Sequence, residues 1–232
     1  MFKRLPMIWI LSLVMLLHSP IVAKAVTVSN APQLEAAISS AQSGGDKTIA
    51  LSDGVYSLSQ MLVVTTNGVT VYGASGNRDA VIIEGKGMSG SISHIFNVAG
   101  SNFTVRDVTL RMVANHAIQI HGENNADSPV IRNVHILDTG EQMVKVSYDD
   151  ANMSVGSDNG IMENCLLEYS AGIGPQYYIG GIDGHNAKNW IVRNNVFKGI
   201  RSPSSSQAEH AIHFWSDSKD TLSEGNTIIN CD

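Results

Sequence analysis

The hydrophobic pattern of the chain repeats about every thirty residues. Five short segments alternate apolar and polar residues over five to seven positions, and turn residues separate them. These segments are FTVRDVTLRM (103–112), VIRNVHILD (130–138), IMENCLLEY (161–169), WIVRNNVFKGI (190–200) and TLSEGNTIIN (221–230). Aligned on Arg106, Arg132, Glu163, Arg193 and Glu224, they are spaced by 26, 31, 30 and 31 residues. Such alternation predicts strands rather than the paired amphipathic helices of helical repeats, and the period predicts a β-solenoid.

A bend is predicted directly after each aligned position. The residues that follow are Asp107, Asn133, Asn164, Asn194 and Gly225. Asn and Gly tolerate left-handed backbone, and stacked Asn side chains can hydrogen-bond from coil to coil. With this period, these strands and these turns, the chain resembles the right-handed parallel β-helix of the pectate-lyase-like superfamily over nearly all of residues 26–232. The resemblance implies an all-β solenoid.

The two ends of the predicted solenoid differ. A short helix is expected at about residues 31–42, because Asn30 to Gln33 resembles a capping box and apolar residues follow at helical spacing. We expect this helix to cover unpaired strand edges, and residues 68–87 to form the first full coil. The chain stops directly after its last strand, with no amphipathic segment to cover the final coil. Solenoids need terminal caps, so we expect a fragment, or a chain whose later coils are missing.

An export signal is predicted in residues 1–25. Lys3 and Arg4 precede an apolar run, and Ala23-Lys24-Ala25 has the small-residue pattern of a cleavage site. The apolar run is shorter than the roughly 20 residues that a membrane-spanning helix needs. We therefore expect one β-helix domain, residues 26–232, in the periplasm or secreted, without membrane association once the signal is removed.

Charge and cysteine content narrow the expected partners. The formal net charge is −6 at pH 7, which argues against a nucleic-acid partner. Cys165 and Cys231 occupy different places in the repeat and lie two coils apart, beyond the usual reach of a disulfide. Both are expected to be unpaired within the chain, while a bridge to another molecule through Cys231 stays open. The oligomeric state is not predicted.

A second strand of each coil aligns in the same way. The segments are AIQIHGE (117–123), MVKVSYD (143–149), IGGIDGH (179–185) and AIHFWSD (211–217). Because side chains alternate across a strand, one parity should stack inside, namely Ile118, Ile120, Val144, Val146, Ile182, Ile212 and Phe214. The other parity should face water in three columns: Gln119, Lys145, Gly181 and His213; His121, Ser147, Asp183 and Trp215; Glu123, Asp149, His185 and Asp217. His116 and His210 are expected in the core or in the preceding turn.

The outward face carries the candidate chemistry. The resemblance implies a groove for an acidic polysaccharide, in which a Lys or Arg removes the proton beside a uronic carboxylate while bound calcium neutralises that carboxylate. Lys145 is the only lysine of the face and the expected base. The full catalytic set is Lys145, His185, His213 and Asp183. His185 is placed between Asp149 and Asp217, which favours its protonated form. The expected calcium ligands are Asp149, Asp183 and Asp217, which offer hard oxygen donors.

Substrate binding is expected from aromatic residues on this face and from the longer connections beside it. Trp215 is a large apolar group at a solvent-facing position, suited to stacking on a sugar. The expected binding set is Trp215, Gln119, His121, Tyr177, Tyr178 and Arg201. His121, His185 and His213 come from different coils and columns, so no zinc site is expected from them.

Three classes of function stay open. Residues 179–203 resemble a pectate-lyase stretch, and Arg201-Ser202-Pro203 resembles the start of its Arg-x-Pro-x-x-Arg motif, but Ser206 stands where the second arginine belongs. The resemblance therefore favours a lyase or C5-epimerase acting on another acidic polysaccharide. A glycoside hydrolase using Asp149 and Asp183, about 8 Å apart in the predicted columns, is one alternative. A noncatalytic glycan-binding, surface or adhesin protein is the other.

Overall fold

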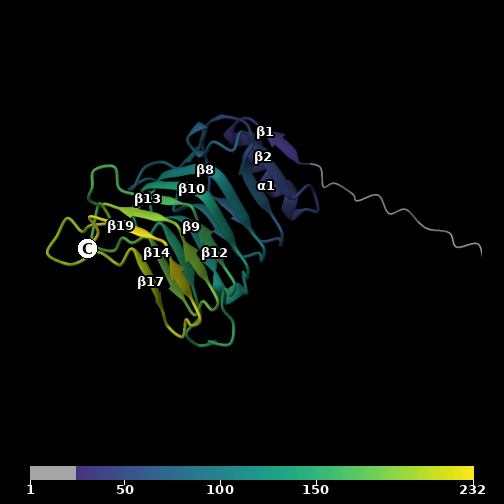
Figure 1. Ribbon diagram of the computed structural model, residues 1–232. Coiled ribbons are helices and arrows are strands. Elements are labelled where there is room, and N and C mark those ends of the chain that lie inside the picture. The colour runs from purple at the N-terminus through teal and green to yellow at the C-terminus, as the bar shows by residue number, and fades with distance from the viewer. Residues whose placement is uncertain (1–24) are drawn as a thin grey trace, which may run out of the picture.

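The computed structural model describes residues 25–232, which form a parallel β-solenoid of about six turns with one α-helix at its N-terminal side (Figure 1). The predicted fold class is confirmed. The expected export signal, apart from its last residue, lies outside the described residues. Within residues 25–232, no helix is both long and apolar enough to cross a membrane.

The solenoid has three walls, and each coil contributes one strand to each wall. The first wall contains β1 (Val26–Val28), β2 (Thr48–Leu51), β5 (Thr70–Gly73), the first half of β8 (Thr104–Val113), the first half of β10 (Val130–Thr139), β12 (Ile161–Glu163), β15 (Ile191–Arg193) and β18 (Leu222–Glu224). The second contains β3 (Gly54–Ser57), β6 (Val81–Glu84), the second halves of β8 and β10, β13 (Leu166–Glu168), β16 (Val196–Lys198) and β19 (Thr227–Ile229). The third contains β4 (Leu62–Val64), β7 (His94–Val98), β9 (His116–His121), β11 (Val144–Ser147), β14 (Ile182–His185) and β17 (Ile212–Trp215). Two short 3₁₀ turns cover Arg78–Ala80 and Gly122–Asn124.

The register of the first wall confirms the predicted alignment of the repeat. Arg132 pairs with Arg106 on one side and Glu163 on the other, and Arg193 follows Glu163. The Glu163 carboxylate forms ion pairs with both Arg132 and Arg193. Burial raises the pKa of Glu163, but the bonds from Arg193 and Arg132 outweigh burial, so the pKa is lowered overall. Glu163 thus links three successive coils.

The predicted bend between the first and second walls is also confirmed. The backbone is left-handed at each expected position, with φ of 59°, 50°, 56°, 55° and 63° at Asp107, Asn133, Asn164, Asn194 and Gly225. The Asn133 amide donates to Asp107 Oδ1 at 2.8 Å. A second ladder lies one residue further along. There Asn195 Oδ1 accepts from the backbone N–H of Cys165, at 2.9 Å, and Asn226 Oδ1 accepts from the backbone N–H of Asn195, at 3.0 Å.

The N-terminal helix α1 (Ala31–Gln42) matches the predicted bounds. The Asn30 side chain accepts from the backbone N–H of Gln33 at 3.0 Å, and the Gln33 side chain accepts from the backbone N–H of Ser29 at 2.9 Å. Its apolar face is buried against β1–β4 through Leu34, Ala37, Ile38 and Ala41. Because these side chains join the same core as the first coils, the helix covers that end of the stack.

The third wall buries the predicted parity. The side chains of Ile118, Ile120, Val144, Val146 and Ile182 are fully buried. Ile212 and Phe214 are only half-buried, because β17 has a neighbouring strand on one side alone. Cys165 is buried and Cys231 is half-buried, and neither forms a disulfide within the described chain, as predicted.

Candidate functional site

The outward side chains of β9, β11, β14 and β17 form a continuous polar face, but their register differs from the predicted columns. Lys145 pairs with Gln119 and with Asp183, and Asp183 pairs with His213. His185 pairs with Trp215, and Ser147 with His121. The prediction that placed Gly181 beside Lys145 was therefore wrong by two residues in β14.

Side-chain packing explains the observed register of β14. A shift of two residues keeps the same parity outward, so alternation alone could not separate the two registers. In the observed register Gly184 lies opposite Phe214 and Val146. A Cβ atom added to Gly184 would lie 2.7 Å from the Phe214 ring. The missing side chain of Gly184 makes room for the large inward ring of Phe214.

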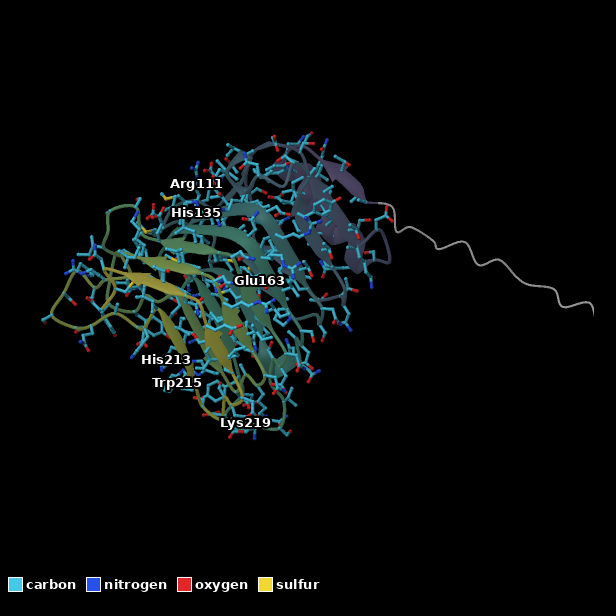
Figure 2. All side chains as sticks on the ribbon, in the orientation of Figure 1. Arg111, His135, Glu163, His213, Trp215 and Lys219 are labelled. Atoms are coloured by element: carbon cyan, nitrogen blue, oxygen red, sulfur yellow. The ribbon has the colours of Figure 1, made fainter. Side chains whose placement is uncertain are left out.

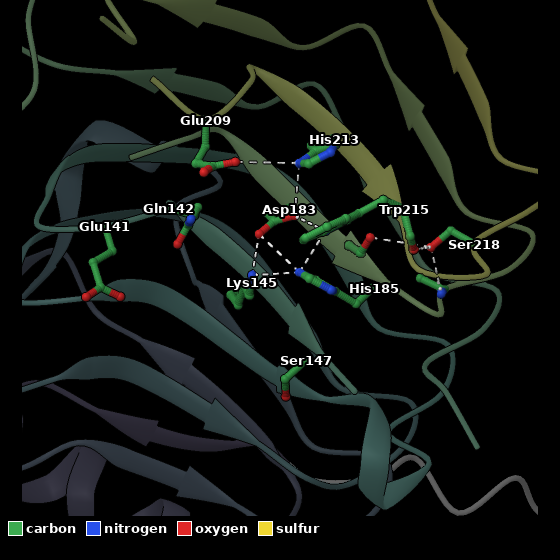
Figure 3. A network of polar contacts seen from close by, with 12 residues as sticks. Glu141, Gln142, Lys145, Ser147, Asp183, His185, Glu209, His213, Trp215 and Ser218 are labelled. Atoms are coloured by element: carbon green, nitrogen blue, oxygen red, sulfur yellow. Dashed lines mark hydrogen bonds and ion pairs between the residues drawn. The ribbon is translucent and has the colours of Figure 1, made fainter. Parts of the chain in front are cut away.

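Asp183 is the centre of the polar network (Figure 3). Its side chain is 3 % exposed and forms an ion pair with Lys145 Nζ, whose side chain is 12 % exposed. The Trp215 indole donates to Asp183 Oδ1 at 3.1 Å. Burial raises the pKa of Asp183, but contacts with His185 and Lys145 outweigh burial and bring the pKa down to about 2. Asp183 is thus an anion at neutral pH, and the half-buried Lys145 is its counter-ion.

His185 lies beside this pair. Lys145 Nζ, at 2.9 Å, and Trp215 Nε1, at 2.8 Å, both donate to His185 Nε2, so this nitrogen carries the lone pair. The ring stacks on Tyr148 with centroids 4.8 Å apart. The predicted place of His185 between Asp149 and Asp217 is wrong because the register of β14 differs.

His213 borders the same carboxylate from β17. Its Nδ1 lies 3.4 Å from Asp183 Oδ1 and 3.8 Å from Glu209 Oε2. Nδ1 is buried without a hydrogen-bond partner among the described residues, although the side chain as a whole is 24 % exposed. Burial lowers the pKa of His213, and His210 lowers it further, while Asp183 and Glu209 oppose this shift. The ring is therefore neutral near pH 7.

A second set of polar residues continues the face toward β7. Gln119 donates to Ser147 Oγ at 2.9 Å, and Ser147 donates to Glu123 at 2.7 Å. His121 Nδ1 contacts Glu123 at 2.7 Å, and His121 Nε2 contacts the side-chain oxygen of Asn97. The predicted binding residues Gln119 and His121 thus share one wall with Lys145 and Asp183.

The remaining predicted residues lie outside this network. Tyr177 and Tyr178 are exposed on the 169–181 connection, and their rings contact each other edge to face. Arg201 lies 3.7 Å from Asp232. Asp149 and Asp217 sit in exposed turns that follow β11 and β17.

The predicted calcium ligands Asp149, Asp183 and Asp217 do not converge within the described chain. Of the three, Asp183 is already held by Lys145 and Trp215. This donor set does not fit a calcium site. In a paired-Asp hydrolase, an ionised Asp183 with a pKa of about 2 would be unsuited to the role of general acid.

Several residues of the site were missed by the sequence interpretation. Tyr148 follows β11 and stacks on His185, while Glu209 and His210 precede β17 and face His213. His116 is buried, as predicted, and its Nδ1 contacts the backbone oxygen of Gln142 at 2.8 Å. His210, by contrast, is exposed. Figure 2 shows His213 and Trp215 on a different side of the solenoid from Arg111 and His135.

Comparisons with known proteins support the architecture. No family model and no curated protein sequence matches this chain. Among solved structures, it is similar to the alginate lyase from Paenibacillus sp. str. FPU-7, with a TM-score of 0.57 and 15 % sequence identity. The match covers 87 % of this chain and 75 % of that one. At this identity the likeness shows a shared fold, so the chain is a parallel β-solenoid of the kind seen in that alginate lyase.

Proposed function

We propose that this protein acts outside the cytoplasm on an acidic polysaccharide and cleaves it by elimination at a uronic acid. The observation that carries the proposal is the juxtaposition of a half-buried cation, Lys145, and a neutral imidazole, His213, on either side of Asp183. The His213 ring also stacks on the exposed Trp215. The fold shared with an alginate lyase makes an alginate-type uronan the first substrate to test.

Elimination needs two different groups. A positive group must neutralise the uronic carboxylate so that the neighbouring C5 proton becomes acidic, and a neutral base must then remove that proton. The ion pair with Asp183 keeps Lys145 charged, which suits the first role better than the role of base expected from the sequence. His213 suits the second role, because its lowered pKa leaves the imidazole neutral and its side chain is 24 % exposed beside Asp183.

The proposed step is a β-elimination at the uronic acid. His213 Nε2 takes the C5 proton, and the electron pair of that C–H bond forms the C4–C5 double bond. The C4–O glycosidic bond breaks, and the leaving oxygen takes a proton from water. A C5-epimerase would share the first half of this step, but would return a proton to C5 from the opposite side and leave the glycosidic bond intact.

Sugar binding is assigned to the aromatic surface around the network. Trp215 is 49 % exposed, yet its indole N–H is held by Asp183 and His185. The ring is thus fixed in place, with His213 stacked on it at a centroid distance of 5.1 Å, and its exposed part is available for stacking on a sugar. Tyr177 and Tyr178 are also exposed, on the connection that precedes β14.

A panel of uronans, followed by the ultraviolet absorbance of the C4–C5 double bond, tests the proposal. We expect product from at least one uronan, and a loss of at least about 100-fold in His213→Ala, within the usual contribution of a general base. Lys198→Ala is the matched control for Lys145→Ala, because Lys198 is an exposed lysine paired with Glu168 on the second wall. Since Lys145→Ala leaves Asp183 buried without its cation, the double variant Lys145→Met/Asp183→Asn provides a second test of the same role.

One observation favours a noncatalytic glycan-binding protein as the second candidate. Lys145 and Asp183 already neutralise each other. Such a protein would bind a glycan through Trp215 and form no unsaturated product. Retained glycan binding without product on every uronan, and without a change in uronic acid configuration by NMR, would replace the enzymatic proposal by this one.

A further inference from the structure

A cluster of three metal-binding side chains lies at the edge of the polar network, where the chain enters β17. One ligand atom from each of Glu209, His210 and His213 lies within 4.8 Å of the others. The sequence here reads Glu-His-Ala-Ile-His, and residues three apart on a regular strand would point to opposite faces. Because β17 begins only at Ile212, His210 precedes the extended segment and its ring stacks on that of His213, with centroids 4.8 Å apart.

We propose that Glu209, His210 and His213 bind a divalent transition-metal ion of the zinc class. Two imidazoles and one carboxylate are the ligand set of open zinc sites, in which water or another ligand completes the tetrahedron. Calcium and magnesium prefer sets made of oxygen alone. The site differs from the three aspartates considered for calcium and from the three histidines of separate coils.

His213 provides the second observation that points to a ligand. Its Nδ1 is buried and makes no hydrogen bond within residues 25–232, although it lies 3.8 Å from Glu209 Oε2. Two ligand atoms about 2.1 Å from one tetrahedral zinc ion are about 3.4 Å apart. A movement of a few tenths of an ångström would therefore bring Glu209 Oε2 and His213 Nδ1 to a coordinating distance, while the ligand atom of His210 lies within 4.8 Å of the other two residues.

Backbone hydrogen bonds hold the segment that carries Glu209 and His210, and solvent can reach both side chains. The backbone N–H of Glu209 donates to the backbone oxygen of Tyr177 at 3.3 Å, and the backbone oxygen of His210 accepts from the backbone N–H of Gly181 at 3.2 Å. The His210 side chain is exposed and Glu209 is half-buried, so an ion can enter from solvent. Asp183 is excluded from the ligand set because Lys145 and Trp215 already hold its carboxylate.

A bound ion would change the tautomer of His213, a consequence that rests on the proposed function. Coordination through Nδ1 places the ring proton on Nε2, the atom assigned as proton acceptor in the elimination step. Metal occupancy therefore blocks the base, and a metal of this class is expected to inhibit the reaction while leaving Trp215 free to bind sugar.

Titration of chelator-treated, tag-free protein with zinc, followed calorimetrically, tests the site, and cobalt(II) provides a spectroscopic probe. We expect one ion per chain, visible cobalt bands of tetrahedral intensity, and an affinity reduced at least about tenfold in both His210→Ala and Glu209→Gln. His135→Ala is the control, because His135 also lies beside carboxylates, Glu168 and Asp79, but on the second wall.

Absence of binding at millimolar zinc, or binding unchanged in His210→Ala, would overturn the metal site. The readout is independent of catalysis. Zinc binding at these residues without product from any uronan would overturn the proposed function alone. Product formation unaffected by saturating zinc would overturn the link between the metal site and His213 as base.

Discussion

Asp183→Asn offers a direct test of the charge network, because protonated Asp and Asn have almost the same shape. The ion pair and contacts of Asp183 lower its pKa from 3.8 to about 2 in the folded protein. Each pKa unit corresponds to 1.36 kcal/mol, so the ionised carboxylate contributes about 2.5 kcal/mol to the free energy of unfolding. The side chain is 3 % exposed, so little of this contribution is screened by solvent.

The sign of the pH dependence follows from the direction of the shift. A depressed pKa stabilises the fold fully above the unfolded value of 3.8, and this stabilisation is lost as the pH falls through about 2. At pH 7 the variant should therefore be less stable than the wild type by about 2.5 kcal/mol, and at pH 3 by about half of that.

Urea unfolding at pH 7 and pH 3, followed by far-ultraviolet circular dichroism, measures both differences. Asp149→Asn is the matched control, because Asp149 lies in an exposed turn and accepts a backbone bond from Ala151 that Asn can also accept. Its stability should change by less than about 0.5 kcal/mol at either pH. An Asp183→Asn difference below about 1 kcal/mol at pH 7, or one that does not shrink at pH 3, would show that the ion pair does not stabilise the fold as described.

Three further predictions concern the solenoid itself. Asn195→Ala should lower the free energy of unfolding by about 2 to 3 kcal/mol, because it leaves the buried backbone N–H of Cys165 and the backbone oxygen of Met162 without partners. Urea unfolding measures this loss, and a loss below about 1 kcal/mol would contradict the role of the Asn195 hydrogen bonds. Gly184→Ala should cost about 1 to 3 kcal/mol through overpacking against Phe214, and an unchanged unfolding midpoint would contradict the observed register of β14. Burial raises the pKa of Cys165 to about 12, so a colourimetric thiol reagent should modify this thiol only in denaturant, and rapid reaction in native buffer would contradict its burial.

The fold could be predicted further than the site, and particular residues show why. The position of Glu163 between two arginines and the left-handed residues at the bends recur at a fixed interval, so the sequence carries them directly. The register of β14 was not accessible from alternation. Gly181 and Gly184 have no side chain to mark which position faces the core.

The contacts of the site depend on how side chains bend across the wall and on where each strand begins. Trp215 was expected to be a sugar platform, but its hydrogen bonds to Asp183 and His185 depend on that register. Glu209 and His210 lie before the first residue of β17, in a connection whose path has no periodic pattern. Their approach to His213 follows from tertiary packing rather than from spacing along the chain.

Because the polar residues of the third wall come from separate coils, a whole coil could be deleted from the protein. Excision of residues 161–190 would join Gly160 to Ile191 and remove β12, β13 and β14 together. The shortened stack would bring β11 beside β17, so that Lys145 faced His213 with no carboxylate between them. The solenoid fold would be kept, but an amine and an imidazole would face each other where the ion pair had been. The fold of this chain therefore does not by itself determine the chemistry of the third wall.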